Sequence, residues 1–271
     1  MSWLQLENKI VVVTGGASGI GRACCEAFAE VGAWVVVADI NKDGAQKVAE
    51  NLTSSYGGQH MAHFLDVTNK KSVDELFSSV TNSFKRVDVL VNNAGILIPR
   101  LLVDPQGKEE LTEEIWDKVV SINQKGYFLC AQSAARIMIK CGGGVIINVS
   151  SESGLEGSEG QSVYAATKGA IYAMTRSWAK ELGKYNIRVV GVAPGIIEVT
   201  GLRTPEYERA LAYTRGITVE ELRATYEKIS VPLGRSGKLR EVADTIVFLA
   251  SHRAGYIHGT TINISGGKSR G

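Results

Sequence analysis

Short apolar runs alternate with longer amphipathic stretches along this chain of 271 residues. Runs rich in β-branched residues, bounded by glycine, asparagine or aspartate, are typical of strands buried on both faces of a parallel sheet. They occur at residues 10–13, 34–38, 87–91, 145–149, 188–192 and 261–264. The stretches between them predict helices, among them Ser72–Phe84, Leu111–Ile122 and Val163–Leu182. This alternation predicts an α/β fold, a doubly wound parallel sheet of about seven strands with helices on both faces.

The first apolar run leads straight into a glycine-rich turn. Gly15, Gly19 and Gly21 are followed by apolar residues at helical spacing up to Gly32, and a second apolar run ends at Asp39. Strand, glycine turn, helix, strand and acid in this order make up the dinucleotide-binding unit of a Rossmann fold. In that unit, backbone amides at the helix start receive a pyrophosphate. The glycine spacing departs from G-x-G-x-x-G, and the turn alone fits a plain tight connection equally well.

Asp39 bears on which dinucleotide would bind. A carboxylate accepts a hydrogen bond from the 2′-hydroxyl of NAD and repels the 2′-phosphate of NADP. Ser18 in the turn is neutral, and Ile40 and Asn41 after the acid bring no charge. The predicted cofactor is therefore NAD.

Composition and charge narrow the class of protein. Hydrophobic residues make up 44% of the chain, and 5 prolines and 30 glycines form no linker-like tract, so residues 1–271 are expected to form a single NAD-binding catalytic domain. A net charge of +2, from 30 basic and 28 acidic residues, gives no case for nucleic-acid or membrane binding.

No apolar run approaches the ~20 residues of a spanning helix, and the start lacks the pattern of a signal peptide. A cytoplasmic location is expected.

The four cysteines are interpreted as buried, reduced thiols, because no Cys-x-x-Cys pair is present. They are Cys24, Cys25, Cys130 and Cys141. His60 and His63 have a spacing compatible with metal binding, but no cluster of acids or thiols accompanies them. No metal is predicted.

Tyr164 and Lys168 are the strongest candidates for chemistry. They are four residues apart in an alanine-rich stretch, so on a helix their side chains share one face. A nearby cation lowers the pKa of a phenol, which makes the pair a candidate acid/base for carbonyl chemistry. Alone, such a pair is more often a solvated surface pair, but here it follows a dinucleotide-binding unit. Ser151 lies thirteen residues upstream, next to Ser150, and only one of the two serines can face Tyr164 because successive strand residues point to opposite faces.

Together these residues resemble those of the short-chain dehydrogenase/reductase family, over nearly the whole chain. The motifs in order are Thr14-Gly15-x-x-x-Gly19-x-Gly21, Asp66-Val67, Asn92-Asn93-Ala94-Gly95, Asn123, Ser151, Tyr164-x-x-x-Lys168 and Pro194-Gly195. The resemblance implies Tyr164 as the catalytic acid/base and Ser151, selected by the thirteen-residue interval, as the partner of the substrate oxygen. It implies that Lys168 holds the nicotinamide ribose and lowers the tyrosine pKa, and that Asn123 supports a water-linked proton path.

The same resemblance implies cofactor contacts. The implied residues are Gly15, Ser18, Gly19, Ile20, Gly21, Asp39, Asp66, Val67, Asn93, Ala94, Gly95, Tyr164, Lys168, Pro194, Gly195 and Ile197. Asn92 would brace the central strand. One departure is that many relatives have a threonine five residues after the proline, where this chain has Val199 and then Thr200.

Substrate recognition is expected in three loops, 96–110, 152–163 and 196–238. The segment between Ser151 and Tyr164 carries three carboxylates among hydroxyl and amide groups, which suits a polyhydroxylated ligand better than a steroid. The alternative is a solvated loop rich in turn residues. Cations for an anionic group such as phosphate could come from Arg100, Lys125, Arg203, Arg215, Arg235 and Lys238. The predicted substrate contacts are Arg100, Glu152, Glu156, Gln161 and Arg203.

Several loop and terminal segments resemble one bacterial subfamily, the sorbitol-6-phosphate 2-dehydrogenases. These segments are 122–126, 154–162, 201–204, 213–216, 232–238 and 266–271. The resemblance implies a polyol or sugar phosphate as the small-molecule partner, with oxidation of sorbitol 6-phosphate to fructose 6-phosphate by NAD. The alternatives are an unphosphorylated polyol or sugar dehydrogenase and a 3-oxoacyl reductase. Asp39 disfavours the reductase, because such an enzyme prefers NADPH. A non-catalytic dinucleotide sensor would be expected to lack part of the catalytic set.

Two predicted helices, Leu111–Gln132 and Val163–Leu182, carry apolar residues on more than one face. That pattern indicates burial against a neighbouring subunit, or under the loops of the same chain. Members of the family are commonly tetramers, so a homotetramer is expected.

Overall fold

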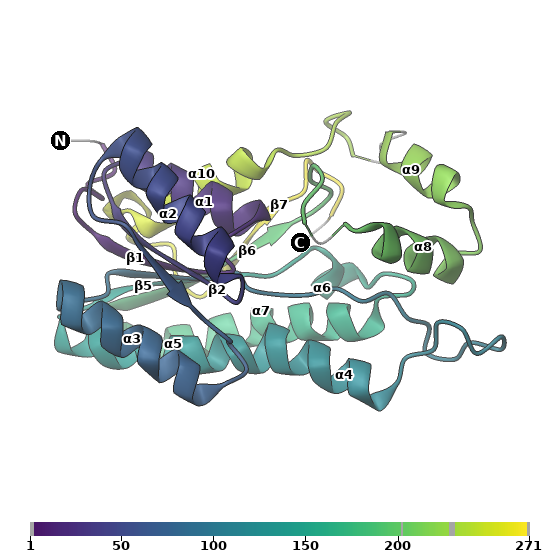
Figure 1. The fold of residues 1–271 in the computed structure, drawn as a ribbon, viewed down its shortest axis with the longest axis horizontal. Coiled ribbons are helices and arrows are strands. Elements are labelled where there is room, and N and C mark those ends of the chain that lie inside the picture. Colours follow the sequence, from purple (N-terminus) through teal and green to yellow (C-terminus); the bar gives the residue numbers. More distant parts are fainter. Residues whose placement is uncertain (1–2, 202, 228–230, 270–271) are drawn as a thin grey trace.

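The computed structural model describes residues 3–201, 203–227 and 231–269, and it contains one seven-stranded sheet (Figure 1). All neighbouring strands run parallel, in the order β3-β2-β1-β4-β5-β6-β7. The strands are β1 (Ile10–Thr14), β2 (Trp34–Asp39), β3 (Met61–Phe64), β4 (Val89–Asn92), β5 (Gly144–Val149), β6 (Ile187–Pro194) and β7 (Thr261–Ile264). The predicted doubly wound parallel sheet is confirmed.

Helices cover both faces of the sheet (Figure 1). One face is covered by α1 (Gly19–Glu30), α2 (Lys42–Tyr56) and α10 (Leu239–Ala250). The other face is covered by α3 (Lys70–Phe84), α5 (Gly126–Lys140) and α7 (Ser162–Leu182), and α4 (Glu113–Val120) packs against α7. Three further helices, α6 (Ser153–Glu156), α8 (Pro205–Thr214) and α9 (Val219–Glu227), lie toward one end of the molecule. Short helical turns occur at Ser121–Lys125, Gly183–Tyr185 and His252–Ala254.

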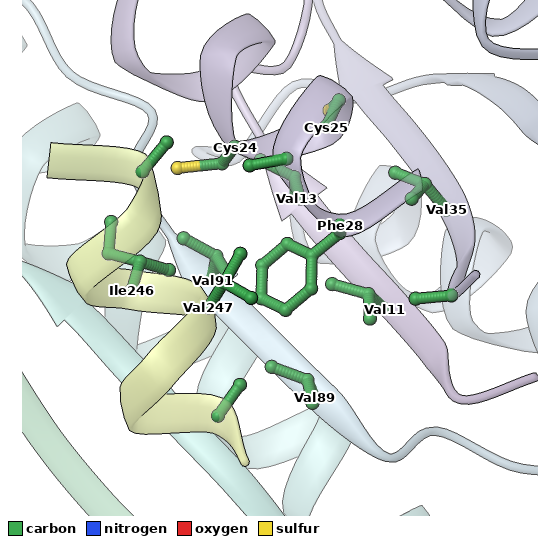
Figure 2. Close-up of a cluster of buried hydrophobic side chains, with 14 of the residues drawn as sticks. Val11, Val13, Cys24, Cys25, Phe28, Val35, Val89, Val91, Ile246 and Val247 are labelled. Carbon is green, nitrogen blue, oxygen red and sulfur yellow. The ribbon is translucent and has the colours of Figure 1, made fainter. Parts of the chain in front are cut away.

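The core consists of two apolar layers, one on each side of the sheet. Residues of β1 alternate between them, so that Val11 and Val13 face one layer while Ile10 and Val12 face the other. Figure 2 shows the first layer, in which Phe28 of α1 lies among valines of the sheet and of α10. Burial on both faces explains why the strand sequences are continuous apolar runs.

Some element boundaries differ from the sequence-based prediction. Strand β4 starts at Val89, two residues later than predicted, and the carboxylate of Asp88 before it accepts from the amide of Ile10 at 2.9 Å. Strand β3 was not among the predicted runs, since its sequence Met61–Phe64 contains no β-branched residue. The predicted helix Leu111–Ile122 begins after Thr112, whose hydroxyl accepts from the amide of Ile115. It then passes through a π-helical turn directly into α5.

The thiols of Cys24, Cys25 and Cys130 are buried as predicted, and burial raises the pKa of each. The prediction is wrong for Cys141, which is exposed at the end of α5, just before three consecutive glycines. Among the described residues there is no group of three or more metal-ligating side chains. In the same parts of the chain, no helix is long and apolar enough to cross a membrane.

Candidate active site

The glycine turn after β1 brings backbone very close to backbone. Gly15 and Gly19 have φ values of +66° and +54°, which disfavour residues with a Cβ atom. A Cβ atom at Gly21 would lie 2.0 Å from the carbonyl oxygen of Gly15. Ser18 precedes α1 in an extended conformation, and its side chain does not cap the helix. The first backbone amides of α1 therefore have no side-chain cap from Ser18. They lie at the carboxyl end of β1 and can bind an anion, as at other anion-binding helix N-termini.

A cavity of about 330 Å³, which we call the glycine-turn cavity, lies beside this turn. Most of the predicted cofactor residues line it, namely Gly15, Ser18, Gly19, Ile20, Asp39, Asp66, Val67, Asn93, Ala94 and Gly95. The carboxylate of Asp39 accepts from the amides of Ala17 at 3.0 Å and Asn41 at 2.8 Å, which fixes its orientation. Among the described residues that line this cavity there is neither lysine nor arginine.

The segment after β4 is tied to the glycine turn by side-chain hydrogen bonds. The amide group of Asn93 donates to the carbonyl oxygens of Thr14 at 2.9 Å and Gly15 at 3.2 Å. The hydroxyl of Thr14 accepts in return from the backbone amides of Asn93 and Ala94. Asn92 donates to the side chain of Asn148 at 3.0 Å, so it links β4 to β5. These bonds hold the floor of the cavity rigidly at the carboxyl ends of the strands.

Helix α7 presents Tyr164 and Lys168 on one face, as their spacing predicted. The ammonium of Lys168 lies 5.6 Å from the centre of the Tyr164 ring and donates to the carbonyl oxygen of Val149 at 2.8 Å. The hydroxyl of Ser151 hydrogen-bonds to Tyr164, whereas the hydroxyl of Ser150 donates to the backbone of Lys168 at 2.7 Å. The neighbouring serines thus face different partners, and Ser151 faces the tyrosine.

Burial shifts both titratable groups of this pair. The phenol of Tyr164 is partly exposed, and burial of the rest raises its pKa to about 12, while the hydrogen bond from Ser151 acts in the opposite direction. Burial lowers the pKa of Lys168 to about 7. Burial thus disfavours the charged form of both groups, and the lowering of the tyrosine pKa by the lysine stays a prediction.

Asn123 lies in the π-helical turn and is fully buried. Its side chain accepts from the amide of Ile96 at 2.8 Å and donates to the carbonyl oxygen of Ile96 at 2.9 Å. It also donates to the hydroxyl of Thr167 on α7, at 3.3 Å. Asn123 therefore joins the loop after β4 to the catalytic helix, and its part in a proton path stays a prediction.

A larger cavity of about 510 Å³, which we call the active-site cleft, opens beside these residues. It is lined by Ser151, Tyr164 and Lys168, by Pro194, Gly195 and Ile197, and by four of the five predicted substrate residues, Glu152, Glu156, Gln161 and Arg203. Arg100, the fifth, does not line it. Its guanidinium pairs with Glu109 at 2.5 Å and donates to the carbonyl oxygen of Pro99, because the loop after β4 folds onto itself.

Lys268 is a member of the cleft that the sequence did not reveal. Its ammonium lies 2.6 Å from Glu152 and 3.7 Å from Glu156. The second carboxylate oxygen of Glu152 is buried without a partner in the described structure. The only signal for Lys268 was the resemblance of the terminal segment 266–271, of which Arg270 and Gly271 lie outside the described residues. Residues 202 and 228–230 of the predicted substrate loop 196–238 also lie outside them.

Residues 9–210 match the family model of short chain dehydrogenases. The chain belongs to this family. It is an oxidoreductase that acts on CH–OH groups, in a family that uses NAD or NADP. The predicted family and reaction class are confirmed.

This short-chain dehydrogenase has relatives that match it from end to end. It is 54% identical to sorbitol-6-phosphate 2-dehydrogenase of Klebsiella pneumoniae, with 100% of this chain and 99% of the relative covered. It is 42% identical to a 3-oxoacyl-[acyl-carrier-protein] reductase of Thermotoga maritima, with 97% and 99% covered. The crystal structure of a short-chain type dehydrogenase/reductase from Mycobacterium marinum superposes with a TM-score of 0.87 at 32% identity, covering 99% of this chain and 98% of the other.

Proposed function

We propose that this enzyme oxidises a sugar-alcohol phosphate with NAD, and that its substrate is sorbitol 6-phosphate, which becomes fructose 6-phosphate. One observation carries the proposal. The group of Ser151, Tyr164 and Lys168 shares a single cleft with a wall of carboxylates, amides and basic side chains. Such a wall suits a ligand with many hydroxyl groups and one anionic end. The similarity to the Klebsiella pneumoniae relative over the full chain supports the same substrate.

In the proposed reaction, Tyr164 takes the proton of the substrate hydroxyl on its phenolate oxygen. The O–H bond and the C–H bond of that carbon break, the C–H electron pair leaves as a hydride, and a C=O bond forms. NAD, when bound, supplies the hydride acceptor. Ser151 stabilises the developing charge on the substrate oxygen by a hydrogen bond.

Lys168 is proposed to make the phenolate form of Tyr164 accessible. A phenol with a pKa of about 12 is a weak base at neutral pH, so its anion needs a cation beside it. Lys168, with a pKa of about 7, gains a proton readily when a negative charge forms 5.6 Å away at the tyrosine ring. The two groups then titrate as a coupled pair rather than one by one.

NAD rather than NADP is proposed because of the charge around the glycine-turn cavity. Asp39 is the acid at its edge, and no lysine or arginine of the described lining is present to neutralise a 2′-phosphate. The residues proposed to contact NAD are those that the family resemblance implies, and all of them except Gly21 line either this cavity or the active-site cleft.

Initial rates in a two-by-two design test the proposal. Sorbitol 6-phosphate and sorbitol are each offered with NAD and with NADP, and the pair of sorbitol 6-phosphate with NAD is expected to give the highest kcat/KM. A higher kcat/KM with sorbitol would favour the unphosphorylated polyol dehydrogenase instead. Failure to oxidise either polyol would sink the substrate assignment, and reduction of a 3-oxoacyl thioester by NADPH would replace it.

We also propose that the chain is one catalytic domain that assembles as a homotetramer. The helices α4 and α5 expose large apolar side chains, including Trp116 at 44% and Phe128 at 42% of their surface. Apolar surface on neighbouring helices is typical of a subunit contact. Sedimentation velocity tests this, and a monomer at micromolar concentration would contradict it.

A further inference from the structure

The six cations that the sequence offered for an anionic substrate group fall into three sets. Arg100 is paired with Glu109 away from the cleft, and Lys125 is exposed on the π-helical turn and does not line it. Arg235 and Lys238 line a separate cavity beside α10, where Arg235 pairs with Glu241 at 2.5 Å. The remaining two, Arg203 and Arg215, line the active-site cleft together with Lys268.

The charges in the cleft are divided between two ends. Next to Ser151, one ammonium from Lys268 faces the two carboxylates of Glu152 and Glu156, so these three groups together carry one surplus negative charge. At α8, the buried carboxylate of Glu208 receives two guanidinium groups, Arg203 at 2.7 Å and Arg223 at 2.7 Å. Glu220 also lies near enough to Arg223 to raise its pKa, so the positive charge that faces the cleft at this end comes from Arg203 and Arg215, which both line it.

Arg215 adds to the positive end and has no carboxylate partner within the described ranges. Its guanidinium makes one weak contact, a hydrogen bond of 3.5 Å to the hydroxyl of Ser158. A weak bond between a half-buried guanidinium and a hydroxyl is easily replaced by two stronger bonds to a phosphate oxygen.

Close packing fixes Arg215 at this place. Thr214, at the end of α8, lies so near to Gly160 that a Cβ atom at Gly160 would be 2.2 Å from its hydroxyl. Gly160 also has a φ value of +71°. The end of α8 therefore packs on the 152–161 wall of the cleft, and Arg215 follows directly beside Ser158.

We propose that Arg215 and Ser158 form the phosphate-binding site of the substrate, with Arg203 of the same cleft beside them. The inference rests on the proposed function and deepens it. A phosphate monoester carries about −1.5 to −2 charges at pH 7, which the positive end of the cleft can balance. The hydroxyl-bearing end of the substrate then lies at the carboxylates beside Ser151, and the phosphate lies at the opposite end.

The test compares Arg215→Ala and Arg215→Lys with the wild type on two substrates, sorbitol 6-phosphate and sorbitol, in the presence of NAD. The ratio of the two kcat/KM values is expected to fall about 30-fold in Arg215→Ala, since hydrogen bonds to charged groups have this strength. Arg215→Lys keeps the charge without the planar fork, so its loss is expected to lie in between. Arg209→Ala on the same helix, paired with Glu206 at the surface, is the matched control and should keep the ratio within about twofold.

Binding of sorbitol 6-phosphate to the enzyme–NADH complex, measured by calorimetry, separates this inference from the proposed function. If the wild type binds but does not oxidise the compound and Arg215→Ala binds it weakly, the phosphate site stands and the proposed function fails. If the wild type oxidises the compound, and Arg215→Ala keeps the wild-type ratio or loses kcat/KM equally for both substrates, the phosphate site is refuted and the proposed function stands. If the wild type does not bind it at all, both are overturned.

Discussion

Tyr164 and Lys168 are held in an environment that favours their neutral forms. Burial raises the pKa of the phenol and lowers that of the amine, so near pH 7 the phenol keeps its proton and the amine holds one about half of the time. Among the described residues, no ion pair holds either group in one charge state. A small electrostatic change at the cleft can therefore move a proton between substrate, tyrosine and lysine.

Replacing Tyr164 by phenylalanine removes the proposed acid/base and little else. We expect kcat to fall by roughly 10²- to 10⁴-fold, the usual contribution of general acid–base catalysis, with NAD affinity changed by less than about threefold. Steady-state kinetics and a fluorescence titration with NADH measure the two quantities. Tyr185→Phe, at an exposed position in the helical turn Gly183–Tyr185 after α7, is the control. Near-normal turnover of Tyr164→Phe would refute the assignment.

Asp39→Asn tests the basis of cofactor choice. The substitution removes the charge that repels a 2′-phosphate and keeps one acceptor oxygen, so only one of the amides of Ala17 and Asn41 retains its bond. We expect the kcat/KM ratio of NADP to NAD to rise roughly tenfold or more, with initial rates as the measurement. Asp43→Asn, an exposed acid in the first turn of α2, is the control and should leave the ratio unchanged. An unaltered ratio in Asp39→Asn would assign selectivity to other residues.

At the scale of elements, the prediction succeeded where one physical pattern dominates. Buried parallel strands are continuous apolar runs, so β7 was predicted at its observed bounds and β2 to within one residue. It failed where that pattern is missing, as at β3, whose sequence Met61–Phe64 contains no β-branched residue. The π-helical turn at Ser121–Lys125 gave no signal, because apolar spacing continues through it into α5.

The glycine turn between β1 and α1 depends on the absence of a side chain at Gly21. A methyl group there would overlap the carbonyl oxygen of Gly15 at 2.0 Å and the side chain of Asn93 at 2.6 Å. We expect Gly21→Ala to lose about 2–4 kcal/mol of stability and to weaken NADH binding at least tenfold. Urea unfolding and NADH titration measure both effects.

Gly142→Ala is the matched control for this prediction. Gly142 has a φ value of +85° but nothing within 4 Å of a Cβ atom, so the substitution adds backbone strain without a clash. It should cost about 1–2 kcal/mol and leave NADH binding unchanged. Equal effects of the two substitutions on NADH binding would show that the close approach in the turn is not needed for the cofactor.

At the scale of the whole molecule, the candidate site is assembled from segments that lie far apart in the sequence. The carboxyl ends of the parallel strands all lie at the same end of the sheet. Asp39, Ser151 and Pro194 each follow or end a predicted strand, so the sequence alone could place them together there. Contacts between loops, in contrast, have no periodic sequence pattern from which they could be predicted. The pairing of Lys268 with Glu152 and the approach of Arg215 to Ser158 needed the folded chain to become visible.

Burial of Lys168 makes the stability of the whole molecule depend on pH. An unfolded lysine keeps its proton up to pH 10.5, whereas Lys168 in the folded chain loses it near pH 7. Between these values unfolding takes up a proton, so the free energy of unfolding rises with pH by on the order of 1.4 kcal/mol per pH unit from this group.

Lys168→Met removes this pH-dependent contribution to the free energy of unfolding. Its stability relative to the wild type should be highest below pH 7 and decline steadily toward pH 10, as measured by urea unfolding across that range. Lys180→Met, on the exposed side of α7, should follow the wild type at every pH, and a Lys168→Met profile parallel to the wild type would show that the lysine is solvated in the folded protein.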